Sequence, residues 1–335
     1  MMQCGLDNPD EMKLGQTVNH LLHGRLIPGG CMSDLKLFRI DDGTAVELLG
    51  TALALEKPLQ VLIERNMEVL FGVRLVASEH STGKKHGGRI DSLGLDENGS
   101  PVIFEYKRSV NENVINQGLF YLDWLLDHRA EFELLVMKRF GREAAEQIDW
   151  SSPRLVCVAS DFTRYDEHAI AQINRSIELV RYRDYDASFL TLDLMASTSA
   201  AATSAEDLES PGRASASERT VAQLHQRASE DLRNLYDALD VYLLALGDDV
   251  TKIVRKNYYA YRRIKNFACV EIHPQTRKLL VYLKTDPGSI TLEAGFTRDM
   301  TKIGHFGTGD LEVAIGDRGD FERAQPLLVA SYQAS

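Results

Sequence analysis

The sequence has few cysteines and no long apolar run. Its four cysteines, Cys4, Cys31, Cys157 and Cys269, show no spacing typical of a metal site, and the last two fall in apolar, strand-like runs. We therefore expect buried free thiols in a reducing cytoplasm, not a disulfide framework. Neither a signal peptide nor an apolar stretch of membrane-spanning length occurs, which predicts a soluble, cytoplasmic protein without membrane contact.

Positive charge is also in deficit. The chain carries a net charge of −11, with a pI near 5.4, which excludes a surface coated with positive charge for non-specific DNA binding. Any nucleic-acid site must therefore be a local patch. With 335 residues, of which 44% are hydrophobic, the chain can bury a substantial core and is long enough for two domains.

Residues 89–117 carry the most informative pattern in the chain. Two apolar runs flank Glu97-Asn98-Gly99, and an Asn-Gly pair is a strong turn signal, so we expect a β-hairpin. Asp91 would lie on its first strand, with Glu105 and Lys107 on its second. Because side chains alternate along a strand, one face would carry Ile103, Glu105 and Lys107, and the other Val102, Phe104 and Tyr106.

An acid and a base two residues apart inside an apolar strand need compensation, because burying either charge alone costs several kcal/mol. A Mg²⁺ or Mn²⁺ ion held by Asp91 and Glu105, with the Lys107 ammonium ready to meet a reacting anion, would provide it. A buried ion pair between Glu105 and Lys107, or an exposed edge strand, is the structural alternative.

The series Asp91, Glu105, Lys107 and Gln117 resembles the PD-(D/E)xK nuclease superfamily, which has the restriction-endonuclease-like fold. The sequence motifs around these residues are most similar to those of the NucS-like branch of bacterial and archaeal endonucleases. They are Gly-Arg-Ile-Asp, Glu-Tyr-Lys-Arg and Asn-Gln-Gly-Leu-Phe-Tyr-Leu. Ile90 stands where the family label has proline, which leaves the ligands untouched. The resemblance covers roughly residues 50–195 and implies a metal-dependent nuclease, acting on DNA in repair or defence, with these four residues catalytic.

Two helices would add residues to this site. Residues 55–71 have helical spacing, with Glu56 on the apolar stripe, so that Glu56 could join the metal ligands; the resemblance also implies a helical glutamate before the aspartate. Glu64 and Glu68 are the competing acids, and Glu56 could instead only favour the helix dipole. Gln117 lies along the buried stripe of a helix over 114–126, where it would orient Lys107 or a water, or cap a strand carbonyl.

Basic residues next to the proposed metal site suggest a contact with the DNA backbone. The loop over 81–88 is rich in glycine, which lets the backbone approach a phosphate closely. An ordinary solvated loop has the same composition. The candidate contacts are Lys84, Lys85, Arg89 and Arg108.

The order of elements predicts an α/β class: a mixed sheet with helices on both faces, followed by a small α+β domain. Further strands are expected over 132–137, 154–160 and 177–182, and helices over 141–148 and 165–176. The domains would comprise an arm and small hairpin (1–50), the nuclease-like domain (51–195), a flexible linker of small polar residues (196–217) and a domain of unknown function (218–335).

The second domain has one basic stretch, residues 252–265, with six lysines and arginines interleaved with three tyrosines. Arg255, Lys256, Arg262 and Arg263 would pair with phosphates while Tyr258, Tyr259 and Tyr261 stack on bases. Core tyrosines and a solvated charged face are the plainer alternative.

The sequence thus predicts a nuclease with nucleic acid, most simply DNA, as its partner. A nuclease-derived fold that only binds nucleic acid or a protein through the second domain is the rival, and a homodimer stays open.

Overall fold

The structure, a computed structural model, describes residues 35–53, 55–108, 113–199 and 220–335. These described residues belong to one compact unit. The predicted N-terminal arm, apart from its hairpin, lies outside the described residues, as do Cys4 and Cys31. Within the described ranges, no helix is both long enough and apolar enough to cross a membrane.

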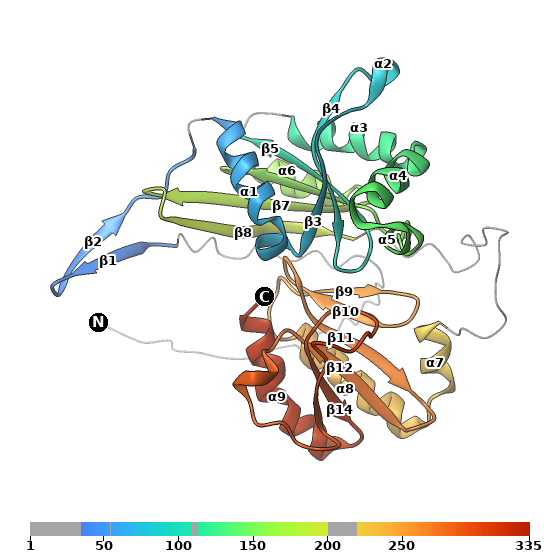
Figure 1. Ribbon diagram of the computed structural model, residues 1–335. Coiled ribbons are helices and arrows are strands. Elements are labelled where there is room, and N and C mark those ends of the chain that lie inside the picture. The colour runs from blue at the N-terminus through green and yellow to red at the C-terminus, as the bar shows by residue number, and fades with distance from the viewer. Residues whose placement is uncertain (1–34, 54, 109–112, 200–219) are drawn as a thin grey trace, which may run out of the picture. The chain divides into compact units, whose positions relative to one another are not determined.

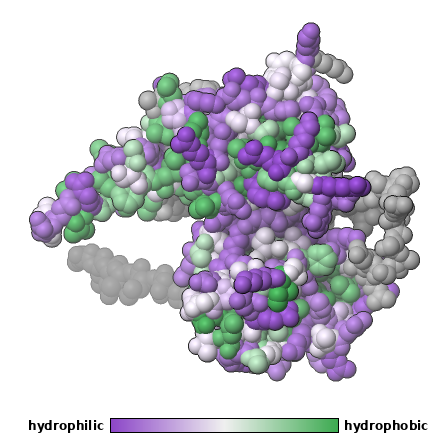
Figure 2. Space-filling model, in the orientation of Figure 1, coloured by the Kyte–Doolittle hydropathy of each residue, from purple (hydrophilic) through white to green (hydrophobic). Residues whose placement is uncertain are grey.

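A small hairpin opens the described chain, within the predicted arm and hairpin region of residues 1–50. Strands β1 (Leu37–Asp41) and β2 (Thr44–Leu48) pair antiparallel through a turn with positive φ at Asp42 and Gly43. Figure 2 shows apolar side chains interleaved with polar ones over its surface. A two-stranded hairpin is marginally stable by itself. The chain behind it is tied down at Thr51, which exchanges two backbone hydrogen bonds with Asp184.

A six-stranded mixed sheet forms the first domain, in the order β3-β4-β5-β6-β7-β8 (Figure 1). The neighbours β5, β6 and β7 are parallel, and the other pairs are antiparallel. The central parallel strand, β6, is buried along its whole length and has a continuous apolar run over residues 155–159, because both of its faces are covered. The strands are β3 (Val73–Ser81), β4 (Arg89–Asp96), β5 (Pro101–Lys107), β6 (Arg154–Ala159), β7 (Ser176–Tyr185) and β8 (Phe189–Thr198).

Helices cover both faces of this sheet (Figure 1). Helix α1 (Glu56–Phe71) packs Leu59 and Ile63 against one face, one helical turn apart, while α3 (Val114–Asp127) and α4 (Arg129–Phe140) cover the other. A Cβ at Gly118 would lie 2.4 Å from the side chain of Leu155, so glycine lets α3 approach β6 closely. Shorter helices are α2 (Gly83–His86), α5 (Arg142–Glu146) and α6 (Arg164–Ala171).

The β4–β5 hairpin is present where it was predicted. Its turn is closed by Asp96, whose Oδ1 accepts hydrogen bonds from the backbone N–H groups of Asn98 (2.9 Å) and Ser100 (2.8 Å). The predicted alternation is also confirmed: Val102, Phe104 and Tyr106 join the core under α1, whereas Ile103 joins the core under α3. This alternation places Glu105 on the α3 face of the sheet.

Two predictions about this domain were wrong. The expected strand over 132–137 is part of α4, because Phe132 and Val136, four residues apart, face the core as helical positions. The expected linker begins too early, since β8 continues to Thr198 in antiparallel register with β7. The remainder of that linker, residues 200–217, lies outside the described residues.

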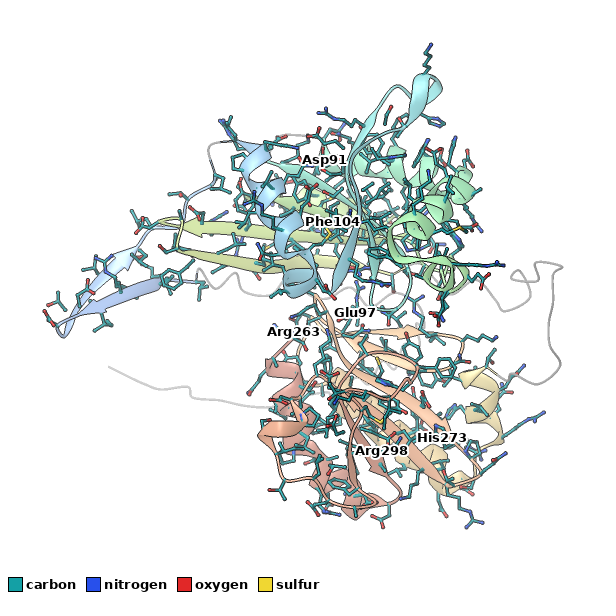
Figure 3. The ribbon with its side chains drawn as sticks, in the orientation of Figure 1. Asp91, Glu97, Phe104, Arg263, His273 and Arg298 are labelled. Atoms are coloured by element: carbon teal, nitrogen blue, oxygen red, sulfur yellow. The ribbon has the colours of Figure 1, made fainter. Side chains whose placement is uncertain are left out.

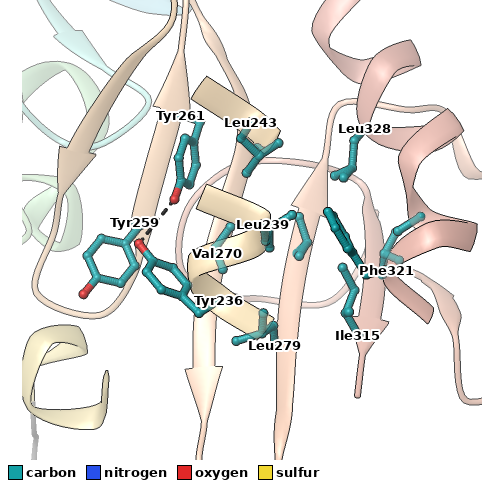
Figure 4. Close-up of a cluster of buried hydrophobic side chains, with 14 of the residues drawn as sticks. Tyr236, Leu239, Leu243, Tyr259, Tyr261, Val270, Leu279, Ile315, Phe321 and Leu328 are labelled. Atoms are coloured by element: carbon teal, nitrogen blue, oxygen red, sulfur yellow. Dashed lines mark hydrogen bonds between the residues drawn. The ribbon is translucent and has the colours of Figure 1, made fainter. Parts of the chain in front are cut away.

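The second domain is an antiparallel sheet in the order β13-β14-β12-β11-β10-β9, with helices packed on its core-facing side. Figure 4 shows this core, where Leu239 and Leu243 of α8 and Phe321 and Leu328 of α9 meet the sheet. The predicted α+β class is confirmed. Its elements are α7 (Val221–Arg227), α8 (Glu230–Leu244), β9 (Thr251–Val254), β10 (Tyr259–Arg262), β11 (Asn266–His273), β12 (Lys278–Leu283), η1 (Pro287–Ser289), β13 (Thr297–Asp299), β14 (Leu311–Ile315) and α9 (Arg318–Gln333).

Candidate active site

Asp91 on β4 and Glu105 on β5 lie beside each other on paired strands. The backbone N–H of Asp91 donates to Glu105 Oε1 (3.3 Å), and the backbone N–H of Tyr106 donates to Asp91 Oδ2 (3.1 Å). Each carboxylate is therefore held by the backbone of the opposite strand. Figure 3 shows Asp91 well removed along this hairpin from Glu97 in its turn.

The Glu105 carboxyl is buried, and only one of its two oxygens has a hydrogen-bond partner among the described residues. The residue is fully buried, and its Oε2 has no hydrogen-bond partner among the described residues. Burial, and then the charge of Asp91, raise the pKa of Glu105 from 4.5 to about 9. Burial also raises the pKa of Asp91, although the hydrogen bond from Tyr106 and the charge of Lys107 oppose it. Two acids are thus held together where their negative charges are unfavourable.

A divalent cation fits this pair. Hard cations such as Mg²⁺ and Mn²⁺ take carboxylate oxygens, and the unpartnered Oε2 of Glu105 is an available donor. The donor set is small, because within the described ranges no three His, Cys, Asp or Glu side chains gather closely enough to hold a metal. The protein ligands would therefore be Asp91 and Glu105, with the remaining positions open to water and substrate.

Glu56, at the start of α1, does not join Asp91 and Glu105 as a third carboxylate. Its Oε1 accepts a hydrogen bond from the backbone N–H of Arg108 (3.3 Å), and its Oε2 lies 3.8 Å from Lys107 Nζ. The expectation that Glu56 joins the metal ligands is therefore not supported by the geometry. Glu56 instead holds the end of β5 and the Lys107 ammonium, whose side chain is 15% exposed.

Gln117 reaches the site through a tyrosine. Its Nε2 lies 3.4 Å from the hydroxyl oxygen of Tyr121, which in turn accepts a hydrogen bond from the backbone N–H of Arg89 (3.2 Å). Arg89 is two residues before Asp91 on β4. The predicted glutamine therefore braces the start of the strand that carries Asp91, and among the described residues its amide makes no hydrogen bond to either carboxylate.

A second brace, from α1, was missed by the sequence analysis. Gln60 is buried, and its Nε2 donates to the backbone oxygen of Asp91 (2.9 Å) and to Glu64 Oε1 (2.9 Å). Ser92 Oγ donates to the same Glu64 oxygen (2.7 Å). Glu64 is thus occupied in holding β4. The available signal was a polar residue at position 60, between the core residues Leu59 and Ile63.

The basic residues near this site are exposed. Lys84 lies on α2, Arg89 at the start of β4 and Arg108 just after β5. Arg89 already forms an ion pair with an acid, since its Nη1 lies 3.3 Å from Glu79 Oε2. The side chain of Lys85 lies outside the described residues. These cations remain candidates for contact with a phosphate backbone.

The basic stretch of the second domain serves a different purpose. Arg255 is buried and forms an ion pair with Asp149, and Arg262 is buried and forms an ion pair with Glu178. Glu178 also pairs with Arg154 (2.8 Å), which reaches Asp96 (2.9 Å). These guanidinium groups fasten the second domain to acids of the first, because leaving any of these charges alone would be costly.

The rest of the stretch does not offer a nucleic-acid surface either. Arg263 pairs with Asp249 (2.6 Å), and only Lys256 of the four predicted contacts is exposed. Tyr258, Tyr259 and Tyr261 are each at most 7% exposed, so their rings cannot stack on bases. Lys252 lies over three tyrosine rings and pairs with Asp240 (2.7 Å). The plainer reading, core tyrosines, is the one that the structure supports.

The two described cysteines match expectation. Cys157 and Cys269 are free and fully buried. Burial raises the pKa of Cys269 to about 11 and that of Cys157 further, which keeps both as unreactive thiols at neutral pH.

Comparison with known proteins gives limited matches. Residues 221–335 match the model of a family described as a domain of unknown function (DUF5655). An uncharacterized protein of Haemophilus influenzae is 26% identical over 295 residues, which is 84% of this chain and 94% of that protein.

Two solved structures are similar over part of the chain. One is a repair endonuclease from Pyrococcus abyssi, 21% identical, with 38% of this chain and 47% of that chain covered and a TM-score of 0.27. The other is a complex of EndoMS with double-stranded DNA, also 21% identical, with 38% and 46% covered and a TM-score of 0.23. The matches therefore span less than half of each solved chain.

Proposed function

We propose that the protein is a divalent-metal-dependent nuclease of the PD-(D/E)xK type that hydrolyses phosphodiester bonds in DNA. The observation that carries this proposal is the buried carboxylate pair, in which Glu105 Oε2 has no hydrogen-bond partner in the described part of the chain and Asp91 adds a second negative charge. A pair that lowers stability in the metal-free protein is understandable if a cation normally compensates it.

The residues around the pair support this chemistry. When bound, a divalent cation polarises a phosphoryl oxygen and lowers the pKa of water. Asp91 and Glu105 would hold it, fixed by the backbone hydrogen bonds that cross between their strands. Lys107, two residues after Glu105 and near Glu56, would stabilise the negative charge that develops on the phosphate.

The supporting braces keep the strands in place. Gln60 donates a hydrogen bond to the backbone carbonyl of Asp91. Gln117 contacts Tyr121, whose hydroxyl accepts a hydrogen bond from the backbone N–H of Arg89, two residues before Asp91. Exposed cations at Lys84, Arg89 and Arg108 would neutralise backbone phosphates on either side of the cut. Only the sequence motifs around the site support the finer proposal that the protein belongs to the NucS-like branch and acts in repair.

A cleavage panel tests the proposal. The purified full chain would be incubated with end-labelled single-stranded, duplex, branched and mismatched DNA in Mg²⁺, in Mn²⁺ or in EDTA. We expect cleavage of at least one substrate with metal and none in EDTA. An RNA set of the same sequences serves as comparison. Absence of cleavage on every substrate in both metals would reject the proposal.

A further inference from the structure

Five aromatic rings form a continuous cluster beside the candidate active site. Trp124 lies face to face with His128, at 4.8 Å between centroids and 14° between planes, and His80 packs against the same tryptophan at 5.2 Å. His86 meets His128 edge-on at 5.5 Å, and Phe120 follows at 5.6 Å from His86. The rings come from β3, α2, α3 and the residue between α3 and α4.

The aromatic cluster is buried at one end and exposed at the other. Trp124 is 1% exposed, whereas Phe120 is 44% exposed. The inner end is fixed by hydrogen bonds, since His80 Nε2 lies 3.2 Å from Glu131 Oε1 and His128 Nδ1 lies 2.8 Å from the carbonyl oxygen of Trp124. Phe120 is therefore held between His86 and Tyr121, whose ring is 5.7 Å away, and it offers the rest of its surface to solvent.

Phe120 lies close to the metal-site strand. The neighbouring Tyr121 accepts the hydrogen bond from the N–H of Arg89, and a Cβ at Gly88 would come within 2.6 Å of the Tyr121 ring. Asp91 follows Arg89 by two residues, about 7 Å along a strand. Gln117 lies about one helical turn before Phe120 on the same helix.

The local charges indicate which part of a nucleic acid would meet this ring. Helix α3 contains no lysine or arginine over Val114–Asp127, so its surface offers phosphates no charge partner. The cations lie beside it, at Lys84 on α2 and Arg89 on β4. A strand whose phosphates follow these cations would place a base, and not a phosphate, over α3. Aromatic rings bind bases of any sequence by stacking.

We propose that Phe120, backed by His86, is a stacking site for a nucleobase next to the scissile phosphate. This inference rests on the proposed function, because it assumes that nucleic acid approaches Asp91 and Glu105. It assigns to α3 a role in substrate binding besides that of carrying Gln117. The ring supplies apolar contact area to the base, and the neighbouring rings of His86 and Tyr121 limit its motion before binding.

A comparison of intact and abasic strands isolates the contribution of base stacking. Fluorescence anisotropy would measure the Kd of the metal-free full chain for a single-stranded DNA and for an abasic strand of the same length. Phe120→Leu should weaken binding of the intact strand roughly 5- to 150-fold and leave the abasic strand unchanged. The salt dependence of Kd should be the same in variant and parent, because no charge is lost.

Two controls make the result specific. Phe120→Trp retains an aromatic face and should keep the preference for the intact strand. Phe189→Leu removes another exposed phenylalanine, on β8, four strands from β4 in the same sheet, and should behave as the parent. If Phe120→Leu equals the parent on both strands, or weakens both equally, Phe120 does not stack on a base and the proposal is overturned.

The outcome can be separated from that of the nuclease proposal. Base-dependent binding lost in Phe120→Leu, together with no metal-dependent cleavage by the parent, would retain the stacking site and reject catalysis. Cleavage by the parent with unchanged binding in Phe120→Leu would retain catalysis and reject the stacking site. Failure of the parent to bind either strand would also reject the stacking site, leaving Phe120 as an apolar contact for a protein.

Discussion

Replacing Glu105 by glutamine should stabilise the metal-free protein, although it removes a proposed catalytic residue. Burial and the neighbouring Asp91 raise the pKa of Glu105 from 4.5 to about 9 in the folded chain. Between these pH values the folded protein keeps a proton that the unfolded chain releases, so the free energy of unfolding falls as the pH rises. Glutamine retains the oxygen that accepts the N–H of Asp91 and cannot ionise.

The size of the effect follows from that shift. Between pH 4.5 and pH 7, about 2.5 pH units, the parent loses about 1.36 kcal/mol of its free energy of unfolding for each unit. Because glutamine does not ionise, Glu105→Gln should avoid this loss and be about 3 kcal/mol more stable than the parent at pH 7. Below pH 4.5 both states carry the proton and the difference should vanish. Above pH 4.5 it should grow with pH until the folded protein also loses its proton, near pH 9.

Urea denaturation followed by tryptophan fluorescence would measure this difference at pH 5, 6, 7 and 8 in EDTA. Glu68→Gln, at an exposed position on the same domain, is the matched control and should change stability by less than about 0.5 kcal/mol. Added Mn²⁺ should stabilise the parent by about 2.7 kcal/mol at a hundred times its Kd, and Glu105→Gln much less. A destabilised Glu105→Gln protein, or a difference independent of pH, would refute the reasoning.

Other changes test separate parts of the structure. Lys107→Met should lower the rate of metal-dependent cleavage roughly 10²- to 10³-fold in single-turnover assays, because it removes one charge that stabilises the phosphate; a rate within threefold of the parent would contradict this role. Gln60→Leu should weaken Mn²⁺ binding roughly 10- to 100-fold through loss of its hydrogen bond to Asp91, with circular dichroism unchanged. Glu178→Gln should lower the free energy of unfolding by roughly 3–5 kcal/mol, because it removes one of the two carboxylates, Glu178 and Asp96, that compensate the buried Arg154 and Arg262. Arg142→Met, at an exposed ion pair with Glu146, should change it by less than about 1 kcal/mol, and equal effects of these two variants would contradict the buried network.

Local patterns were sufficient to predict most elements of the first domain. The Asn-Gly turn, the alternation along β5 and the helical spacing of α1 each act over a few residues, and each is confirmed. The segment over 132–137 was misread because a short apolar run fits a strand as well as a helix, and only packing of Phe132 and Val136 under the sheet decides between them.

The site was predicted less completely because its supports depend on distant pairings. The pairing of Asp91 with Glu105 follows from one hairpin, so sequence alone could propose it. The bond from Gln60 to Asp91 joins residues 31 positions apart and depends on how α1 packs on β4. The ion pairs of Arg255 and Arg262 join residues 106 and 84 positions from their acids, so a basic stretch could not be told from a nucleic-acid surface.

Binding of Mn²⁺ tests the central claim that Asp91 and Glu105 together form a cation site. Electron paramagnetic resonance of free Mn²⁺ would be recorded during titration of the parent, Asp91→Asn, Glu105→Gln and the control Glu68→Gln. We predict one Mn²⁺ site in the parent and in Glu68→Gln, and its loss in Asp91→Asn and Glu105→Gln. Equal binding by all four proteins would contradict it.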